Sequence, residues 1–256
     1  VEVVKKLVTG FFLKMVVADN LNTITETIRY PYFQGFSSLN LLLLLFGYSM
    51  QIFADFAGYS LIAIGLGLLF GYELPKNFNF PYIASSFSEF WRRWHISLST
   101  WLRDYLYISL GGNRKGEFRT YINLFIVMLL GGLWHGASWS YGVWGSMHGF
   151  FLLIERFILK DRLSQQKRSF IGMIYVFSTV SVLWLLFKLT DFSYFLGYFK
   201  AIFENNHIQV KFGIDQVSIL YYAAPVILYH LTYLLKDKES FSLWFSKVDY
   251  LGYAMM

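Results

Sequence analysis

The chain has 256 residues, of which 56% are hydrophobic, 21% aromatic and only 15% charged. A soluble domain is usually about a quarter charged, so this composition indicates an integral membrane protein and excludes an ordinary soluble fold. The net charge of +6 comes from short basic clusters between apolar runs, a pattern typical of cytoplasmic loops and not of nucleic-acid binding. The absence of cysteine excludes disulfides, thiolate chemistry and cysteine-ligated metals.

The first half of the chain contains two apolar segments. Leu7 to Ala18 is interrupted only by Lys14 and is short for a membrane span, and residues 20–37 read as a loop with at most one short helix. Residues 39–72 are apolar except for Asp55. A straight helix of that length would be about 50 Å long, against a hydrocarbon core of about 30 Å, so we expect a break near Asp55 to Gly58. Asp55 itself could be a salt-bridge anchor or a proton-handling group, and the anchor is favoured.

A basic, amphipathic segment precedes the next apolar run. Residues 86–110 have helical periodicity with mixed charges, and 111–116 form a Gly-rich loop. Residues 121–157 are again too long for one span and carry basic clusters on both flanks. Because both clusters belong on the cytoplasmic side, we expect the segment to enter the membrane and return as two short or re-entrant helices. The flanking basic residues are Arg114, Lys115, Arg119, Arg156, Lys160, Arg162, Lys167 and Arg168. Two further spans are predicted at 171–189 and 216–235.

Two histidines lie in or beside these membrane-type segments. His95 follows Trp94, and His135 lies in a run without formal charge from Leu124 to Gly149. Ionisable groups in a bilayer are costly and therefore mark candidate functional sites. A neutral imidazole can serve as a general base near neutral pH. If 131–149 were one helix, His135 would lie in a stripe of small residues with room for a substrate. Both histidines also have a structural alternative. His135 could be a buried histidine hydrogen-bonded between helices, and His95 could have no functional role within an interfacial belt of Trp and Arg.

A cationic set beside the membrane suits either a phosphate-bearing acyl donor or anionic lipid headgroups. The residues are Arg92, Arg93, Arg103, Arg114 and Lys115. His148, His207 and His230 are expected to be structural. The Gly111 to Arg114 loop lacks the spacing of a phosphate-binding P-loop, and no metal-binding motif is present. A channel or transporter with a histidine proton relay is a rival class, although no inverted repeat is visible.

Four long motifs closely resemble the membrane-bound O-acyltransferase superfamily, in its bacterial branch that acetylates alginate and other exopolysaccharides. They are GFFLKMVVADN (10–20), YSMQIFADFAGYSLIAIGL (48–66), LPKNFNFPYIASSFSEFWRRWHISLSTWLRDYLYISLGGNRKG (74–116) and NLFIVMLLGGLWHGASWSYGVWGSMHG (123–149). They cover residues 10–157, whereas 158–256 match only as generic spans. One departure is Leu61, where the family often has an acidic residue.

The resemblance implies an all-α, polytopic membrane protein whose short and re-entrant helices surround an acyl-transfer tunnel. It implies a single domain fragment over 1–256, about the C-terminal half of a larger protein, with its core at 10–157 and further spans within 171–235. The family's membrane histidine falls on His135, in Leu-Trp-His-Gly, and its second polar position falls on His95. Candidate residues for binding the donor or substrate are Trp94, Arg92, Arg93, Arg103, Asn113, Arg114, Trp134 and Ser138.

The implied reaction moves an acyl group, in the first place acetyl, from a cytoplasmic donor to hydroxyls of an extracytoplasmic polysaccharide such as alginate. The donor would be acetyl-CoA or an acyl-carrier thioester, with no bound cofactor. The expected partners are the lipid bilayer and an extracytoplasmic acetyltransferase, and no nucleic acid. The expected location is the bacterial inner membrane. D-alanyl transfer to teichoic acid by a sister branch is the alternative, and the Gly-Gly-Asn-Arg loop favours the polysaccharide branch.

Overall fold

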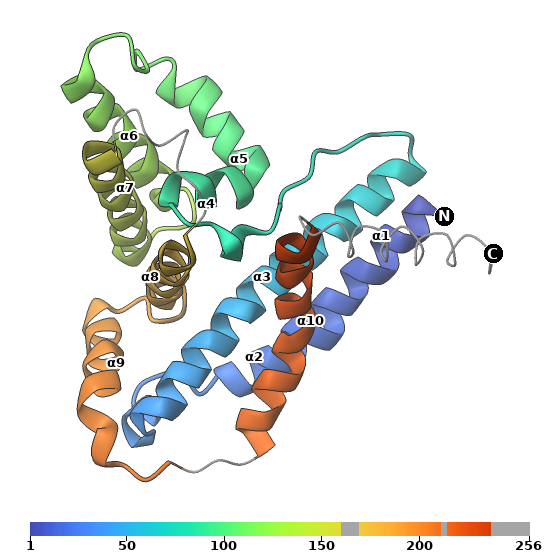
Figure 1. Ribbon diagram of the computed structural model, residues 1–256, viewed down its shortest axis with the longest axis vertical. Coiled ribbons are helices and arrows are strands. Elements are labelled where there is room, and N and C mark those ends of the chain that lie inside the picture. Colours follow the sequence, from blue (N-terminus) through green and yellow to red (C-terminus); the bar gives the residue numbers. More distant parts are fainter. Residues whose placement is uncertain (160–168, 211–213, 237–256) are drawn as a thin grey trace.

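The computed structural model describes residues 1–159, 169–210 and 214–236, and this part of the chain is helical with connecting loops and no strands. Its longer helices are α1 (Glu2–Phe11), α3 (Ser38–Leu69), α6 (Glu117–Leu133), α7 (Trp139–Leu159), α8 (Phe170–Lys188), α9 (Phe192–Glu204) and α10 (Ile214–Lys236). Its shorter ones are η1 (Phe12–Ala18), α2 (Asp19–Thr25), η2 (Tyr32–Gly35), η3 (Pro81–Ile83), α4 (Phe87–Arg93), α5 (Ile96–Trp101), η4 (Leu102–Tyr107) and η6 (Asn205–His207). Figure 1 shows α3 beside α1, and α4 to α7 together in the upper left of the view, above α8. Helix α10 packs against α3 and α2.

Four helical segments of the described residues are long and apolar enough to cross a membrane. They are Glu2–Thr25, Ser38–Leu69, Phe170–Lys188 and Asp215–Leu234. The predicted polytopic all-helical architecture is therefore confirmed, including the spans at 171–189 and 216–235. Helix α9 was not anticipated.

The prediction that the first apolar segment is too short to span was wrong. Helix α1, the π-helix η1 and helix α2 run on without a break from Glu2 to Thr25. Lys14 lies within η1, and its ammonium forms an ion pair with the Asp55 carboxylate of α3 and another, at 3.2 Å, with Asp19. Because its charge is paired, Lys14 does not end the helix.

The predicted break in α3 near Asp55 was also wrong, since α3 is one helix of 32 residues. The Lys14 ion pair compensates Asp55, as expected for an anchor, so the carboxylate needs no break in the helix to escape the apolar run. The nearby glycine serves packing: a Cβ on Gly58 would lie 2.8 Å from the carbonyl oxygen of Gly10, so only glycine permits this approach of α1 and α3. At 1.5 Å per residue α3 is about 48 Å long, so it must tilt or extend beyond the hydrocarbon core.

Residues 121–157 do reverse direction, as predicted, through the paired helices α6 and α7. The condition of one continuous helix over 131–149 is not met, because residues 134–138 form the turn between α6 and α7, with Gly136 at φ = 154°. Gly132 and Gly145 face each other across the pair, where a Cβ on either would lie 3.0 Å from the Cα of the other. Both ends of the segment that carry basic residues, near Arg119 and Arg156, therefore lie on one side of the hairpin. The prediction that Lys160, Arg162, Lys167 and Arg168 lie on the same, cytoplasmic side concerns residues outside the described part of the chain.

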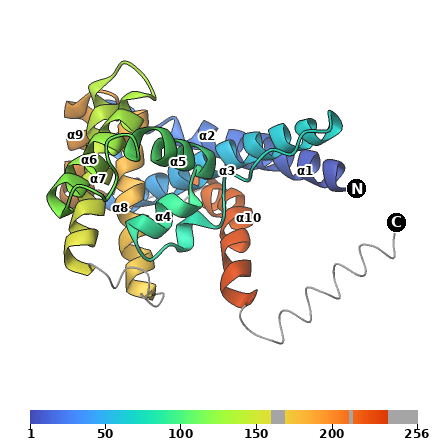
Figure 2. The ribbon, with the colours of Figure 1, turned by 90° about the horizontal axis from the view of Figure 1, so that it is seen from above.

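The amphipathic segment over 86–110 is helical, but it bends sharply between α4 and α5. His95 forms the bend with φ = 44° and ψ = 56°, a left-handed conformation that is rare outside glycine. Trp94, immediately before it, is buried against Trp184 of α8, with ring centroids 4.9 Å apart. The bend therefore turns α5 and η4 away from α4 and towards the α6–α7 pair, an arrangement also visible in Figure 2.

Candidate active site

His95 projects from the bend between α4 and α5 towards helix α3. Its ring meets Phe56 edge to face at a centroid distance of 4.6 Å, and its Nδ1 is buried without a hydrogen-bond partner among the described residues. His95 lies outside the four candidate spans. Burial, with a smaller contribution from His135, lowers the pKa of His95 to about 4. The ring is therefore neutral at physiological pH.

His135 occupies the turn between α6 and α7, where it is half-buried among aromatic rings. Its ring centroid lies 5.2 Å from that of Trp134, 5.4 Å from Trp144 of α7 and 5.1 Å from Phe187 of α8. The two latter contacts are edge to face, which fixes the plane of the imidazole. Neither His135 nor His95 forms an ion pair within the part of the chain described. His135 is thus held by packing, and its proton-accepting nitrogen is not engaged by an acid.

One cavity of about 120 Å³ is lined by both histidines, although they are 40 residues apart in the sequence. Aromatic side chains form most of its wall. It is lined by Tyr48, Ile52, Phe56, Trp91, Trp94, His95, Leu98, His135, Trp144, Trp184 and Phe187. An apolar enclosure of this kind strengthens polar interactions with a reacting group.

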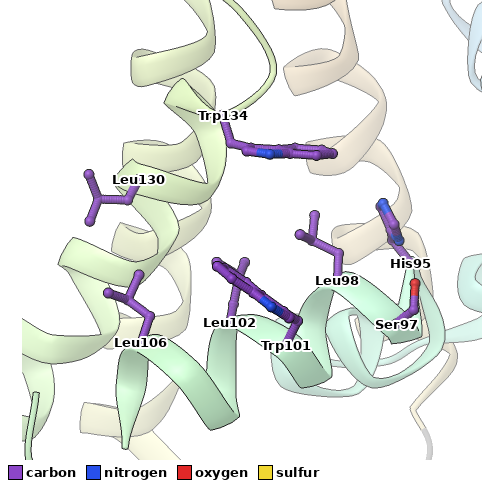
Figure 3. A pocket seen from close by; sticks show the side chains of 8 residues that line it. All are labelled: His95, Ser97, Leu98, Trp101, Leu102, Leu106, Leu130 and Trp134. Atoms are coloured by element: carbon purple, nitrogen blue, oxygen red, sulfur yellow. The ribbon is translucent and has the colours of Figure 1, made fainter. Parts of the chain in front are cut away.

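A larger cavity of about 570 Å³ shares His95 and Leu98 with the small one. In Figure 3 the indoles of Trp134 and Trp101 lie on opposite sides of it, with His95 at one end. Its remaining lining residues are Ser97, Leu102, Leu106 and Leu130. His95 lines both cavities, so a ligand in the larger one can reach the imidazole.

Two of the predicted binding residues line these cavities, Trp94 the smaller one and Trp134 the larger one. The polar candidates line neither, and each has another contact or a surface position. Arg92 bonds Ser88, Arg93 pairs with Glu89, Arg103 pairs with Asp104, Asn113 bonds Tyr107, Ser138 bonds Ser140, and Arg114 is exposed. The donor-binding role of these six residues stays a prediction, and they do not gather around the histidines.

Several cavity residues escaped the sequence analysis, notably Trp144, Trp101 and Phe187. Trp144 and Trp101 stand within the recognised motifs, Trp144 next to Gly145 and Trp101 two residues before Arg103, so both could have drawn attention. Phe187 lies in a generic apolar span with nothing to distinguish it from its neighbours. His148 is fully buried against Trp144, at a centroid distance of 4.7 Å, and lines neither cavity. Among the described residues, no group of three or more His, Asp or Glu is placed to hold a metal ion.

Fold and site together define a polytopic membrane protein with two histidines at one apolar cavity. The family model of the membrane-bound O-acyltransferase family matches residues 3–190, and the chain belongs to this family.

Relatives of the chain act on several polymers. A probable alginate O-acetylase from Pseudomonas putida is 43% identical over 88% of this chain and 46% of its own length. A probable alginate O-acetylase from Pseudomonas aeruginosa is 44% identical over 84% of the chain and 39% of its own length. The teichoic acid D-alanyltransferase of Bacillus subtilis is 33% identical over 61% of the chain and 41% of its own length. The chain thus spans less than half the length of these curated relatives.

Proposed function

We propose that the protein containing this chain is an O-acetyltransferase that moves an acetyl group from a thioester donor towards hydroxyls of an extracytoplasmic polysaccharide such as alginate. The observation that carries the proposal is the single cavity lined by His95 and His135. The higher identity to alginate O-acetylases than to the D-alanyltransferase supports acetyl over D-alanyl transfer. We place the protein in the bacterial inner membrane with an extracytoplasmic acetyltransferase as its partner.

In the proposed reaction a neutral imidazole nitrogen of His135 accepts the proton of the acceptor hydroxyl. The oxygen then attacks the thioester carbonyl, the new C–O bond forms, and the C–S bond breaks. The sulfur leaves with the electron pair and takes the proton back from His135, so a thiol and an O-acyl ester result. His95, neutral because its pKa is about 4, can accept or donate one hydrogen bond to orient either reactant.

The two cavities suggest how the reactants reach the histidines. The larger one has space for the extended arm of a thioester donor, with Trp101 and Trp134 on its sides. Its mainly apolar lining suits a thioester arm better than a charged nucleotide. The donor is therefore proposed to present its acyl end at His95, either as acetyl-CoA or on an acyl carrier.

Replacement of His135 by alanine tests the proposal, and His207→Ala is a matched control. His207 is exposed, its Nδ1 contacts the carbonyl oxygen of Glu204 at 2.9 Å, and it lines neither cavity. O-acetyl groups on the secreted polymer are quantified in cells that produce each variant, together with protein level in the membrane fraction. We expect His135→Ala to lower the transfer rate by about 10²- to 10⁴-fold at unchanged protein level, with normal transfer in the control. Near-normal acetylation in His135→Ala would remove its catalytic assignment.

A further inference from the structure

The bend that carries His95 needs a specific restraint. A non-glycine residue at φ = 44° and ψ = 56° is strained, and such conformations persist only where the surroundings impose them. The bend also decides where the imidazole points, because His95 is its central residue. The contacts that hold this bend therefore also help to orient the His95 ring towards the cavity.

A loop preceding η3 holds the bend from both sides through its backbone. The Asn79 N–H donates to the carbonyl oxygen of Arg93 at 2.9 Å, before the bend. The Ile96 N–H donates to the carbonyl oxygen of Asn77 at 3.0 Å, after it. These two bonds fix the ends of the segment 93–96 against residues 77–79.

The side chain of Asn77 adds a second link on the cavity side. Its Oδ1 accepts hydrogen bonds from the Ser97 hydroxyl at 2.6 Å and from the Ser97 backbone N–H at 3.2 Å. Its Nδ2 donates to the hydroxyl of Ser60 at 3.2 Å, and Ser60 is buried in helix α3. One amide thus ties the first turn of α5 to the longest helix of the fold. Asn77 itself lines neither cavity.

We propose that Asn77 is a positioning residue for the acyl transfer: it locks the left-handed bend so that the His95 ring faces both cavities. This role rests on the proposed function, but the placement of the ring can be measured without it. Asn77 touches no reacting atom and acts through Ser97 and the bend. Its loss should therefore alter turnover and His95 reactivity more than donor binding.

The decisive variants are Asn77→Ala, Asn77→Asp and Asn79→Ala. Alanine removes all three side-chain bonds, whereas aspartate keeps an oxygen that accepts from Ser97. Asn79 is the matched control, because it is exposed and its hydrogen bonds to the described residues involve its backbone N–H and carbonyl oxygen alone. We expect Asn77→Ala to lower turnover at saturating donor by about 10- to 100-fold with KM changed much less, since small misplacements of a reacting group cost this much. Asn77→Asp should recover most of the loss, and Asn79→Ala should behave as the parent protein.

Modification of His95 by diethyl pyrocarbonate reports on the placement of its ring and does not depend on acyl transfer. The rate is followed by mass spectrometry, with His207 as internal reference. We expect Asn77→Ala to change the His95 rate and leave that of His207 unchanged. If Asn77→Ala fails to accumulate, Ser60→Ala can replace it, because it removes only the link to α3. We expect Ser60→Ala to change the His95 modification rate in the same direction but by a smaller amount. Parental turnover and a parental His95 modification rate in the alanine variant would overturn the role of Asn77. If the parent protein transferred no acetyl group while Asn77→Ala altered the His95 modification rate, the proposed function would fall and the positioning of the ring by Asn77 would stand.

Discussion

Substitution of Gly145 by alanine tests whether the tight α6–α7 contact holds the turn that carries His135. A Cβ at this position would overlap the carbonyl oxygen of Met128 and lie 3.0 Å from the Cα of Gly132, where ordinary contacts begin near 3.4 Å. Both partners are backbone, so no side chain can rotate away, and the helices must separate by several tenths of an ångström or more. Overpacking of this kind typically costs about 1–3 kcal/mol.

Gly142→Ala is the control for helix propensity, because it lies on the same helix one turn earlier. There the nearest atoms to a Cβ belong to side chains: Leu133 at 3.2 Å, which can adjust, and Trp139 at an ordinary contact distance of 3.8 Å. Both variants gain about the same 1 kcal/mol that alanine gives over glycine within a helix, so their difference isolates the interhelical contact. We expect Gly145→Ala to be less stable than Gly142→Ala by about 1–3 kcal/mol in thermal unfolding of the detergent-solubilised protein. Equal stability of the two variants would refute the idea that this backbone contact holds the hairpin.

Two further predictions concern charge. Burial favours the neutral form of His95 and lowers its pKa to about 4. Its reactivity with diethyl pyrocarbonate should therefore stay constant as pH falls from 8 through 6 and be lost only as pH falls through about 4. A midpoint near the ordinary histidine value of about 6.5 would contradict this effect of burial. For the Lys14–Asp55 pair, Lys14→Leu should leave the Asp55 carboxylate unpaired within a span, and Asp55→Leu should leave Lys14 with Asp19 as its one remaining partner among the described residues. The double variant removes both charges of the pair. Thermal unfolding in detergent should then show a coupling energy of about 0.5–3 kcal/mol, and strictly additive losses would exclude the anchor.

The sequence was most informative where the bilayer sets the length scale. Apolar runs near 170–188 and 215–234 have the length of the hydrocarbon core, so hydropathy alone located these spans. The run at 121–157 was too long for one crossing, and its basic flanks predicted the reversal that α6 and α7 make. These inferences needed no tertiary contacts, because water and lipid impose them on each segment separately.

The same reasoning failed where a distant residue changed the local balance. Asp55 and Lys14, each costly alone in an apolar segment, pair across α3 and η1, and both helices continue past them. Glycines near Asp55 suggested a break, but Gly58 permits close packing with Gly10 instead. Partners 41 residues apart cannot be recognised from the periodicity of either segment.

The candidate site divides in the same way. The sequence alone determined that His95 and His135 are unusual, because titratable groups are rare in such apolar surroundings. Only the tertiary structure decided that both line one cavity, since this depends on a left-handed bend at His95, a glycine contact between α6 and α7, and Phe187 from α8. It also showed that the arginines which looked like a binding cluster are tied to local partners or exposed. Residue chemistry can be read along the chain, whereas convergence in space depends on backbone geometry and packing between segments distant in sequence.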